Sequence, residues 1–215
     1  MHNPIPKQYM LLAGKPVILH TLEKIEKIDS INEVVVVCAE EYIPQIEEML
    51  RKYHLKKKVL FALSGLTRQD SVFSGLKKVG NKNVIIHEAA RPFVKVEEFE
   101  ELINYQSENV IIGSPINYTV LRGDAFVTGL LNRSELVNVQ LPQKFNTKEL
   151  IEAHEKAKLD NKVFTEDASL LYYYKNDIEI SIIRGKDYNI KLTTPMDMIL
   201  GEQIYNEFFT KGRDV

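Results

Sequence analysis

The sequence contains little cysteine, glycine or proline, and it has no marked excess of either charge. Of its 215 residues, one is Cys, 10 are Gly and 8 are Pro, and 28 Lys and Arg are set against 30 Asp and Glu, for a formal charge of −2. A single cysteine cannot form a disulfide within the chain, and a hydrophobic content of 44% excludes disordered and collagenous proteins. This composition predicts one globular domain over residues 1–215.

The sequence also lacks long runs of positively charged residues and long runs of hydrophobic residues. The longest run of like charge is 56–58, whereas nucleic-acid binding needs many clustered cations, so we expect no nucleic-acid partner. No apolar stretch has the length of a signal peptide or a membrane-spanning helix, which predicts no membrane role. The single Cys38 adjoins the valines of 34–37 and is expected to be a small buried residue. These features predict a cytoplasmic protein.

Short β-branched runs alternate with amphipathic segments over the first half of the chain. The runs are 33–39, 59–63, 84–87 and 110–112. Unbroken apolar runs of this length are typical of strands buried on both faces. In the segments between these runs, apolar residues recur every three or four positions, which predicts helices. The pattern predicts an α/β fold with a mostly parallel, Rossmann-like sheet flanked by helices, and functional residues at the carboxyl ends of the strands.

Residues 117–139 interrupt this alternation. Apolar and polar positions alternate there, and Gly123-Asp124 and Gly129 are turn signals, which predicts a β-hairpin that projects as an arm. The arm either joins two subunits or remains a solvated surface hairpin, and the periodicity favours neither interpretation.

Two segments at expected strand ends contain polar residues with no packing role. In the segment 87–92, Glu88 is a candidate Mg²⁺ ligand and Arg91 a candidate phosphate ligand, although a local ion pair between the two is slightly favoured by the sequence alone. His87 is expected to be half-buried with its hydrogen bonds satisfied. In the segment 63–72, backbone amides suit an anion or a base edge, and ordinary N-capping by Thr67 explains the same residues.

Taken in order, these and other short motifs resemble those of the 2-C-methyl-D-erythritol 4-phosphate cytidylyltransferases and the related ribitol-5-phosphate cytidylyltransferases. The resemblance extends from Pro6 to about Glu202. Its motifs are Pro6-Lys7-Gln8, Gly14-Lys15-Pro16-Val17, Asp70-Ser71-Val72, Gly75-Leu76, His87 to Pro92, Arg133, Pro142-Gln143, Thr165 to Ser169, Asn189-Ile190-Lys191 and Thr194-Pro195. Motifs of zinc hydrolases, thiol redox proteins and α/β-hydrolases are absent.

The resemblance implies a nucleotidyl transfer in which a polyol phosphate attacks the α-phosphorus of CTP in line and expels pyrophosphate, with Mg²⁺ bridging the triphosphate. The implied catalytic residues are Lys7 at the α-phosphate, and Arg133 and Lys191 on the incoming phosphate. The implied CTP-binding residues are Gly65, Ser71, Glu88 and Ala89, with Glu88 also near the metal. The implied substrate-binding residues are Arg91, Thr119 and Thr165. Because Arg133 lies on the arm 117–139, it would act in a partner's site, which implies a homodimer.

The chain departs from the family pattern in several places. Family members begin with a strand and a Gly-rich loop of the form A-A-G-x-G-x-R-M, and we expect this strand and triphosphate loop to be missing because the chain starts at the final Met. Glu88 replaces the usual Asp, Tyr118 replaces an Asp, and Leu141 replaces a Thr. The last two lie near the polyol side, so the identity of the acceptor is less firmly indicated than the use of CTP.

Four hypotheses follow. The leading one is transfer to 2-C-methyl-D-erythritol 4-phosphate for isoprenoid synthesis, and the second is transfer to ribitol 5-phosphate for teichoic acid or capsule polymers. A third, from another class, is a catalytically silent nucleotide-binding or dimerisation module, suggested by the absent loop. Transfer of a different nucleotide ranks last, since α/β folds support many chemistries.

Overall fold

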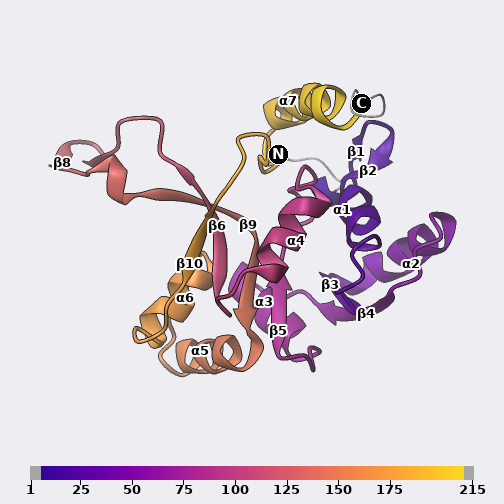
Figure 1. Cartoon of the computed structure of the whole chain (residues 1–215), viewed down its shortest axis with the longest axis horizontal. Coiled ribbons are helices and arrows are strands. Elements are labelled where there is room, and N and C mark those ends of the chain that lie inside the picture. Colours follow the sequence, from indigo (N-terminus) through magenta and orange to yellow (C-terminus); the bar gives the residue numbers. More distant parts are fainter. Residues whose placement is uncertain (1–5, 211–215) are drawn as a thin grey trace.

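The computed structural model describes residues 6–210, which form an α/β fold with an arm projecting from one side (Figure 1). The α-helices are α1 (Val17–Ile25), α2 (Ile43–Lys52), α3 (Arg68–Leu76), α4 (Val96–Asn104), α5 (Thr147–Leu159), α6 (Asp167–Tyr174) and α7 (Pro195–Tyr205). The strands are β1 (Leu11–Leu12), β2 (Lys15–Pro16), β3 (Glu33–Cys38), β4 (Lys58–Leu63), β5 (Asn83–Ile86), β6 (Val110–Pro115), β7 (Leu121–Gly123), β8 (Val127–Leu130), β9 (Val137–Asn146) and β10 (Ser181–Arg184). Shorter helical turns are η1 (Lys7–Tyr9), η2 (Glu40–Tyr42), η3 (Arg133–Glu135) and η4 (Asn206–Thr210).

The central sheet is partly mixed, so the prediction of a mostly parallel sheet is confirmed only in part. Its strand order is β10-β6-β9-β5. β10 and β6 are parallel, but β9 runs antiparallel to both β5 and β6. The chain leaves the sheet along β6, passes through the arm and returns directly as β9, and a return without a crossover helix has to be antiparallel. β3 and β4 form a separate parallel pair.

The four β-branched runs all form strands, namely β3, β4, β5 and β6, and the amphipathic segments between them form α2, α3 and α4. These predictions are confirmed. Phe145 of β9, Leu150 of α5 and Leu171 of α6 are fully buried in one hydrophobic cluster, so these two helices pack against the sheet. Cys38 is buried, as its neighbours predicted. No helix in the described part of the chain is long and apolar enough to cross a membrane.

The arm contains a hairpin shorter than the predicted one. β7 and β8 pair antiparallel at its end, and η3 follows on the way back to the sheet. Residues from Val137 onward belong to β9 and pair with β6, so the final part of the predicted hairpin lies in the sheet. The arm is highly exposed: Phe126 is 82% and Leu130 is 84% accessible. Large apolar side chains are therefore presented to solvent well away from the core.

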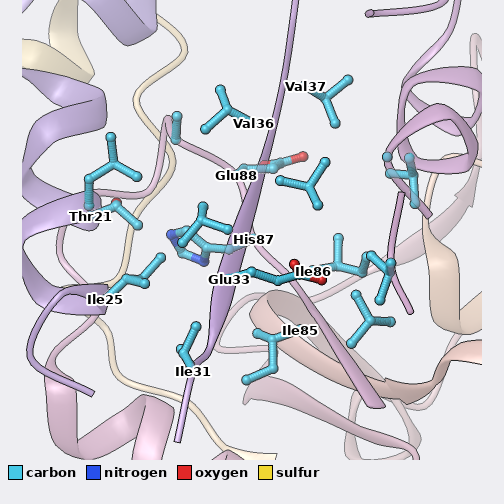
Figure 2. Close-up of a pocket in the computed structure, with 18 of the residues that line it drawn as sticks. Thr21, Ile25, Ile31, Glu33, Val36, Val37, Ile85, Ile86, His87 and Glu88 are labelled. Carbon is cyan, nitrogen blue, oxygen red and sulfur yellow. The ribbon is translucent and has the colours of Figure 1, made fainter. Parts of the chain in front are cut away.

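A cavity of about 950 Å³ separates the β3–β4 pair from the central sheet. Valines of β3 and isoleucines of β5 line it, together with residues of α1 and α3 (Figure 2). Over residues 6–210, β3 pairs only with β4 and β5 only with β9, so the edges that border the cavity have no strand partner there. The carboxyl ends of β3 and β5, at Val37 and Ile86, lie toward the end of the cavity where Glu88 is found (Figure 2).

Candidate active site

Charged side chains from four separate segments meet at the Glu88 end of the cavity. Glu88 follows β5, Lys191 lies between β10 and α7, Lys7 lies in η1, and Arg68 is the first residue of α3. All four line the cavity, and Ala89 lies beside them. Functional residues are expected at the carboxyl ends of strands in α/β sheets, and Glu88 lies two residues beyond the carboxyl end of β5.

Glu88 is the centre of this cluster of charges. Its Oε2 lies 2.8 Å from Lys191 Nζ and 3.8 Å from Arg91 Nε, while its Oε1 accepts a hydrogen bond of 3.1 Å from Arg68 Nε. The local pair with Arg91, which the sequence slightly favoured, is thus the weakest of the three contacts. Burial acts to raise the pKa of the Glu88 carboxyl, but Lys191 and Arg68 together hold it below its usual value. Glu88 is therefore ionised and surrounded by cations.

Lys7 adds a further positive charge to the cluster. Burial lowers the pKa of its ammonium, the nearby charge of Lys191 lowers it further, and Glu88 partly opposes both effects. An anion placed beside Lys7 would stabilise its charged form. With Arg68 and Arg91 also present, the cations outnumber the carboxylate that faces them, which makes this end of the cavity suitable for a phosphate group.

Arg91 and His87 fix the loop behind Glu88. Arg91 Nη1 donates a hydrogen bond of 2.9 Å to the carbonyl of Asn189, and the Asn189 amide donates one of 2.8 Å to the carbonyl of Leu141. His87 Nε2 donates to the carbonyl of Arg91 at 3.0 Å, and burial lowers the pKa of His87 to about 4. Nδ1 of His87 has no hydrogen-bond partner, so the predicted full satisfaction of this histidine is wrong. His87 is a neutral residue that orders the loop.

Gly65 and Ser71 lie together at the start of α3. The Gly65 N–H donates to Ser71 Oγ at 3.0 Å, and Ser71 Oγ donates to the carbonyl of Thr67 at 2.9 Å. Thr67 and Asp70 form a capping box, which confirms the N-capping interpretation of this segment. A Cβ at position 65 would lie 2.3 Å from Asp70 Cβ, so the turn can approach the helix this closely only with glycine.

Three predicted residues lie outside the cluster around Glu88. Thr119 and Arg133 are exposed on the arm, where Arg133 Nη1 donates a hydrogen bond of 3.1 Å to the carbonyl of Asn117. Figure 1 shows the arm projecting away from the body that holds Glu88. Thr165 is exposed just before α6. A single chain therefore does not bring Thr119 or Arg133 to Lys7, Glu88 and Lys191, and their roles remain predictions that depend on a second subunit.

Arg68 and Asp167 are charged residues at this site that sequence reasoning missed. Arg68 Nη2 donates a hydrogen bond of 2.7 Å to Asp167 Oδ2, and the Asp167 side chain is 2% exposed. One signal was present in the sequence: a cation in the first turn of a helix opposes the helix dipole, and Arg68 directly follows the capping residue Thr67. Such a placement indicates a specific partner for the cation.

The residues present are compatible with one Mg²⁺ ion bound together with a phosphate. No group of three His, Cys, Asp or Glu side chains is arranged for metal binding within residues 6–210. Mg²⁺ does not need such a group, because it keeps several waters and is commonly held by one or two carboxylates plus substrate phosphates. Glu88 is an ionised carboxylate at the cationic end of the cavity, so it fits the single-carboxylate arrangement.

Comparison with known proteins identifies the family of the chain. The family model described as 2-C-methyl-D-erythritol 4-phosphate cytidylyltransferase (IspD) matches residues 1–207. Proteins of that name from Clostridium botulinum (strain Okra / Type B1) and Halalkalibacterium halodurans are 38% identical over 212 residues and 35% identical over 211 residues. These alignments span 95% of this chain and 91% of the first relative, and 96% and 90% for the second.

Solved structures give the same result. The structure of 4-diphosphocytidyl-2C-methyl-D-erythritol synthase from Anaerococcus prevotii superposes with a TM-score of 0.86 and 27% identity, over 94% of this chain and 90% of that one. The Francisella tularensis 2-C-methyl-D-erythritol 4-phosphate cytidylyltransferase superposes with a TM-score of 0.77 and 25% identity, over 93% of each chain. By sequence and by structure, this chain belongs to the 2-C-methyl-D-erythritol 4-phosphate cytidylyltransferase family.

Proposed function

We propose that this chain is an enzyme that transfers the cytidylyl group of CTP to 2-C-methyl-D-erythritol 4-phosphate, a step in isoprenoid precursor synthesis. The single observation that supports the chemistry most is the convergence of Lys7, Lys191, Arg68 and Arg91 around one carboxylate, Glu88. The family match supports the choice of substrates, since the relatives compared above are named for this acceptor.

In the proposed reaction, an oxygen of the acceptor phosphate forms a bond to the α-phosphorus of CTP. The bond from that phosphorus to the bridging oxygen breaks, and pyrophosphate leaves with the electron pair. Both reactants are anions, so fixed cations and correct alignment account for most of the acceleration. We assign Lys7 to the α-phosphate and Lys191 to the acceptor phosphate, with Gly65, Ser71 and Ala89 on the nucleotide side and Arg91 and Thr165 on the polyol side.

Glu88 would hold a Mg²⁺ ion that neutralises triphosphate charge when CTP is bound. Lys191, whose Nζ lies 2.8 Å from Glu88 Oε2, would hold a phosphate beside that carboxylate. The low pKa of Glu88 supports this assignment, because the carboxyl is already ionised and needs no proton loss to accept a cation.

The arm suggests how the site is completed. Thr119 and Arg133 are exposed on it, and its apolar side chains, including Phe126 and Leu130, need a partner surface. We therefore propose a homodimer in which the arm of one subunit reaches the site of the other, so that Thr119 and Arg133 act in the partner's site. The single buried cysteine supports a cytoplasmic location.

The test is Mg²⁺-dependent release of pyrophosphate from CTP, measured with 2-C-methyl-D-erythritol 4-phosphate and with ribitol 5-phosphate. Replacement of CTP by UTP, GTP or ATP checks the nucleotide.

We expect turnover with the methylerythritol acceptor and CTP. Faster turnover with ribitol 5-phosphate would instead assign the chain to the second hypothesis. Absence of pyrophosphate release, in protein that still binds CTP by calorimetry, would favour the silent binding module.

A further inference from the structure

The Arg68 guanidinium lies between two carboxylates that come from distant parts of the chain. Its Nε donates to Glu88 Oε1 at 3.1 Å, and its Nη2 donates to Asp167 Oδ2 at 2.7 Å. Arg68 begins α3, Asp167 begins α6 and Glu88 follows β5. One side chain therefore connects three segments at the charged end of the cavity.

Asp167 is the fixed partner in this arrangement. Its side chain is 2% exposed, and its Oδ1 lies 3.6 Å from Nε2 of His154, whose side chain is 1% exposed. The His154 ring in turn stacks on Phe73 of α3, with the ring centroids 5.4 Å apart and the planes 2° from parallel. Burial alone would raise the pKa of Asp167, but His154 and Arg68 hold it below its usual value. A buried carboxylate needs a paired cation, so Arg68 is held firmly to Asp167.

Glu88 is the less confined partner. Its side chain is 20% exposed and has Arg68 on one oxygen and Lys191 on the other. An arginine free of other partners prefers to bind both oxygens of a carboxylate in a bidentate pair. Here Nη2 of Arg68 donates to Asp167, and Glu88 receives its hydrogen bond from Nε. The second oxygen of Glu88 is thereby left facing Lys191.

We propose that Arg68, anchored by Asp167, is a positioning residue that sets the orientation of the Glu88 carboxylate between Arg68 and Lys191. It rests on the proposed function, because the orientation of Glu88 determines how readily Lys191 becomes available to a phosphate. Asp167 also lies two residues after Thr165, so the same link joins the nucleotide side of the site to the segment assigned to the acceptor.

Arg68→Lys tests the geometry because it keeps the positive charge but removes the guanidinium that contacts Glu88 and Asp167 at the same time. We expect kcat to fall about 10²-fold, the size of effect produced by misplacing a reacting group by about 1 Å, with little change in the KM for CTP. Asp167→Asn removes the negative charge that holds Arg68 in place, and we expect it to lower kcat as well. Arg51→Lys on the exposed face of α2 is the matched control and should leave both constants unchanged.

A role through charge alone predicts a different pattern. Asp167→Asn makes the site more positive and would then lower the KM for CTP. Arg68→Gln makes the site less positive and would raise that KM. Arg68→Lys keeps the charge and would have kinetic constants close to those of the wild type. That pattern would overturn the proposal. So would a purely structural role, in which Arg68→Lys and Asp167→Asn lower the melting temperature but leave kcat per folded molecule unchanged.

A second readout does not depend on turnover. The Glu88 carboxyl can be followed by ¹³C NMR titration in the wild-type chain and in Arg68→Lys. We expect its pKa to rise toward the ordinary value in Arg68→Lys, because the ammonium of a lysine anchored by Asp167 does not reach Glu88. An unchanged titration would overturn the proposal even if the wild-type chain turned over. If the wild type does not turn over at all, the proposed function fails and this titration still decides the role of Arg68.

Discussion

Lys191 Nζ lies 2.8 Å from Glu88 Oε2, so an ammonium and a carboxylate from opposite sides of the charged cluster neutralise one another in the free protein. A phosphate that enters this site competes with Glu88 for Lys191. The cation is thus already in place when the anion arrives, and little reorganisation is needed to stabilise the charge that develops at phosphorus.

Removal of either lysine tests the assignment of the cations. We expect Lys7→Ala and Lys191→Ala each to lower kcat by about 10²-fold or more, the size of effect seen when a preorganised electrostatic partner is removed. Lys78→Ala, on the exposed surface after α3, is the control and should retain full turnover. Steady-state kinetics with CTP and the acceptor measures all three, and unchanged turnover in both site variants would contradict the assignment.

The loop that holds Lys191 is stabilised by the capping box at the start of α7. Asp197 Oδ2 accepts hydrogen bonds from the N–H groups of Thr193 and Thr194, and these partners, the Thr193 hydroxyl first among them, lower the pKa of Asp197 to about 2. A lowered pKa in the folded state gives stability that is present above the ordinary value of 3.8 and is lost as the pH falls toward 2.

Asp197→Asn should therefore cost about 1 kcal/mol of unfolding free energy at pH 7, a typical value for a lost cap. The difference from wild type should shrink as the pH is lowered from 4 toward 2. Urea unfolding across this range measures it, with Asp124→Asn on the exposed arm as the control. A difference that is the same at every pH would show that the Asp197 carboxylate is not the stabilising group.

The buried His87 gives a second pH dependence of stability, which comes from burial of the imidazole and not from hydrogen bonds to a carboxylate. Burial lowers its pKa to about 4, below the ordinary value of 6.5, so the unfolded chain takes up a proton between these values and the folded chain does not. Stability is therefore lost as the pH falls from 6.5 to 4, by up to about 3 kcal/mol from this group. We expect the stability of His87→Asn to depend less on pH in this window, as measured by denaturant unfolding, whereas His54→Asn at an exposed position should follow the wild type.

The proposed use of the arm in the partner's site predicts complementation between two inactive variants. In a mixed dimer of Arg133→Ala and Lys191→Ala, one of the two sites would contain an intact Arg133 and an intact Lys191. With random pairing, an equal mixture should recover about one quarter of wild-type turnover. Each variant alone should remain inactive and dimeric by light scattering. A mixture that stays inactive, or a wild-type chain that is monomeric, would contradict the proposed arrangement.

Strands with apolar, β-branched sequences were predictable, whereas β9 was not. Its sequence is rich in polar residues, yet Gln140, Gln143 and Lys144 are buried in it. The partners that satisfy them come from far along the chain: Lys144 Nζ donates to the carbonyls of Ile103 and Tyr105, and Gln140 Nε2 donates to that of Lys186. A local pattern cannot indicate such partners, so the strand that makes the sheet mixed was missed.

The same limit applies to the site. Lys7, Glu88 and Lys191 were identified through motifs, and the fold brings them together. Arg68 and Asp167 are 99 residues apart, and their pairing depends on how α3 and α6 pack around His154 and Phe73. Residues whose chemistry is recognisable in sequence can be predicted singly. Residues that act by holding another side chain in place become visible only in three dimensions.

The cavity between β3 and β5 has the dimensions of a place for one more strand. Each of the two edges that border it presents a row of N–H and C=O groups without a strand partner within residues 6–210, and apolar side chains line the space between them. An extended apolar segment lying there would complete both ladders and join the β3–β4 pair and the central sheet into one continuous sheet.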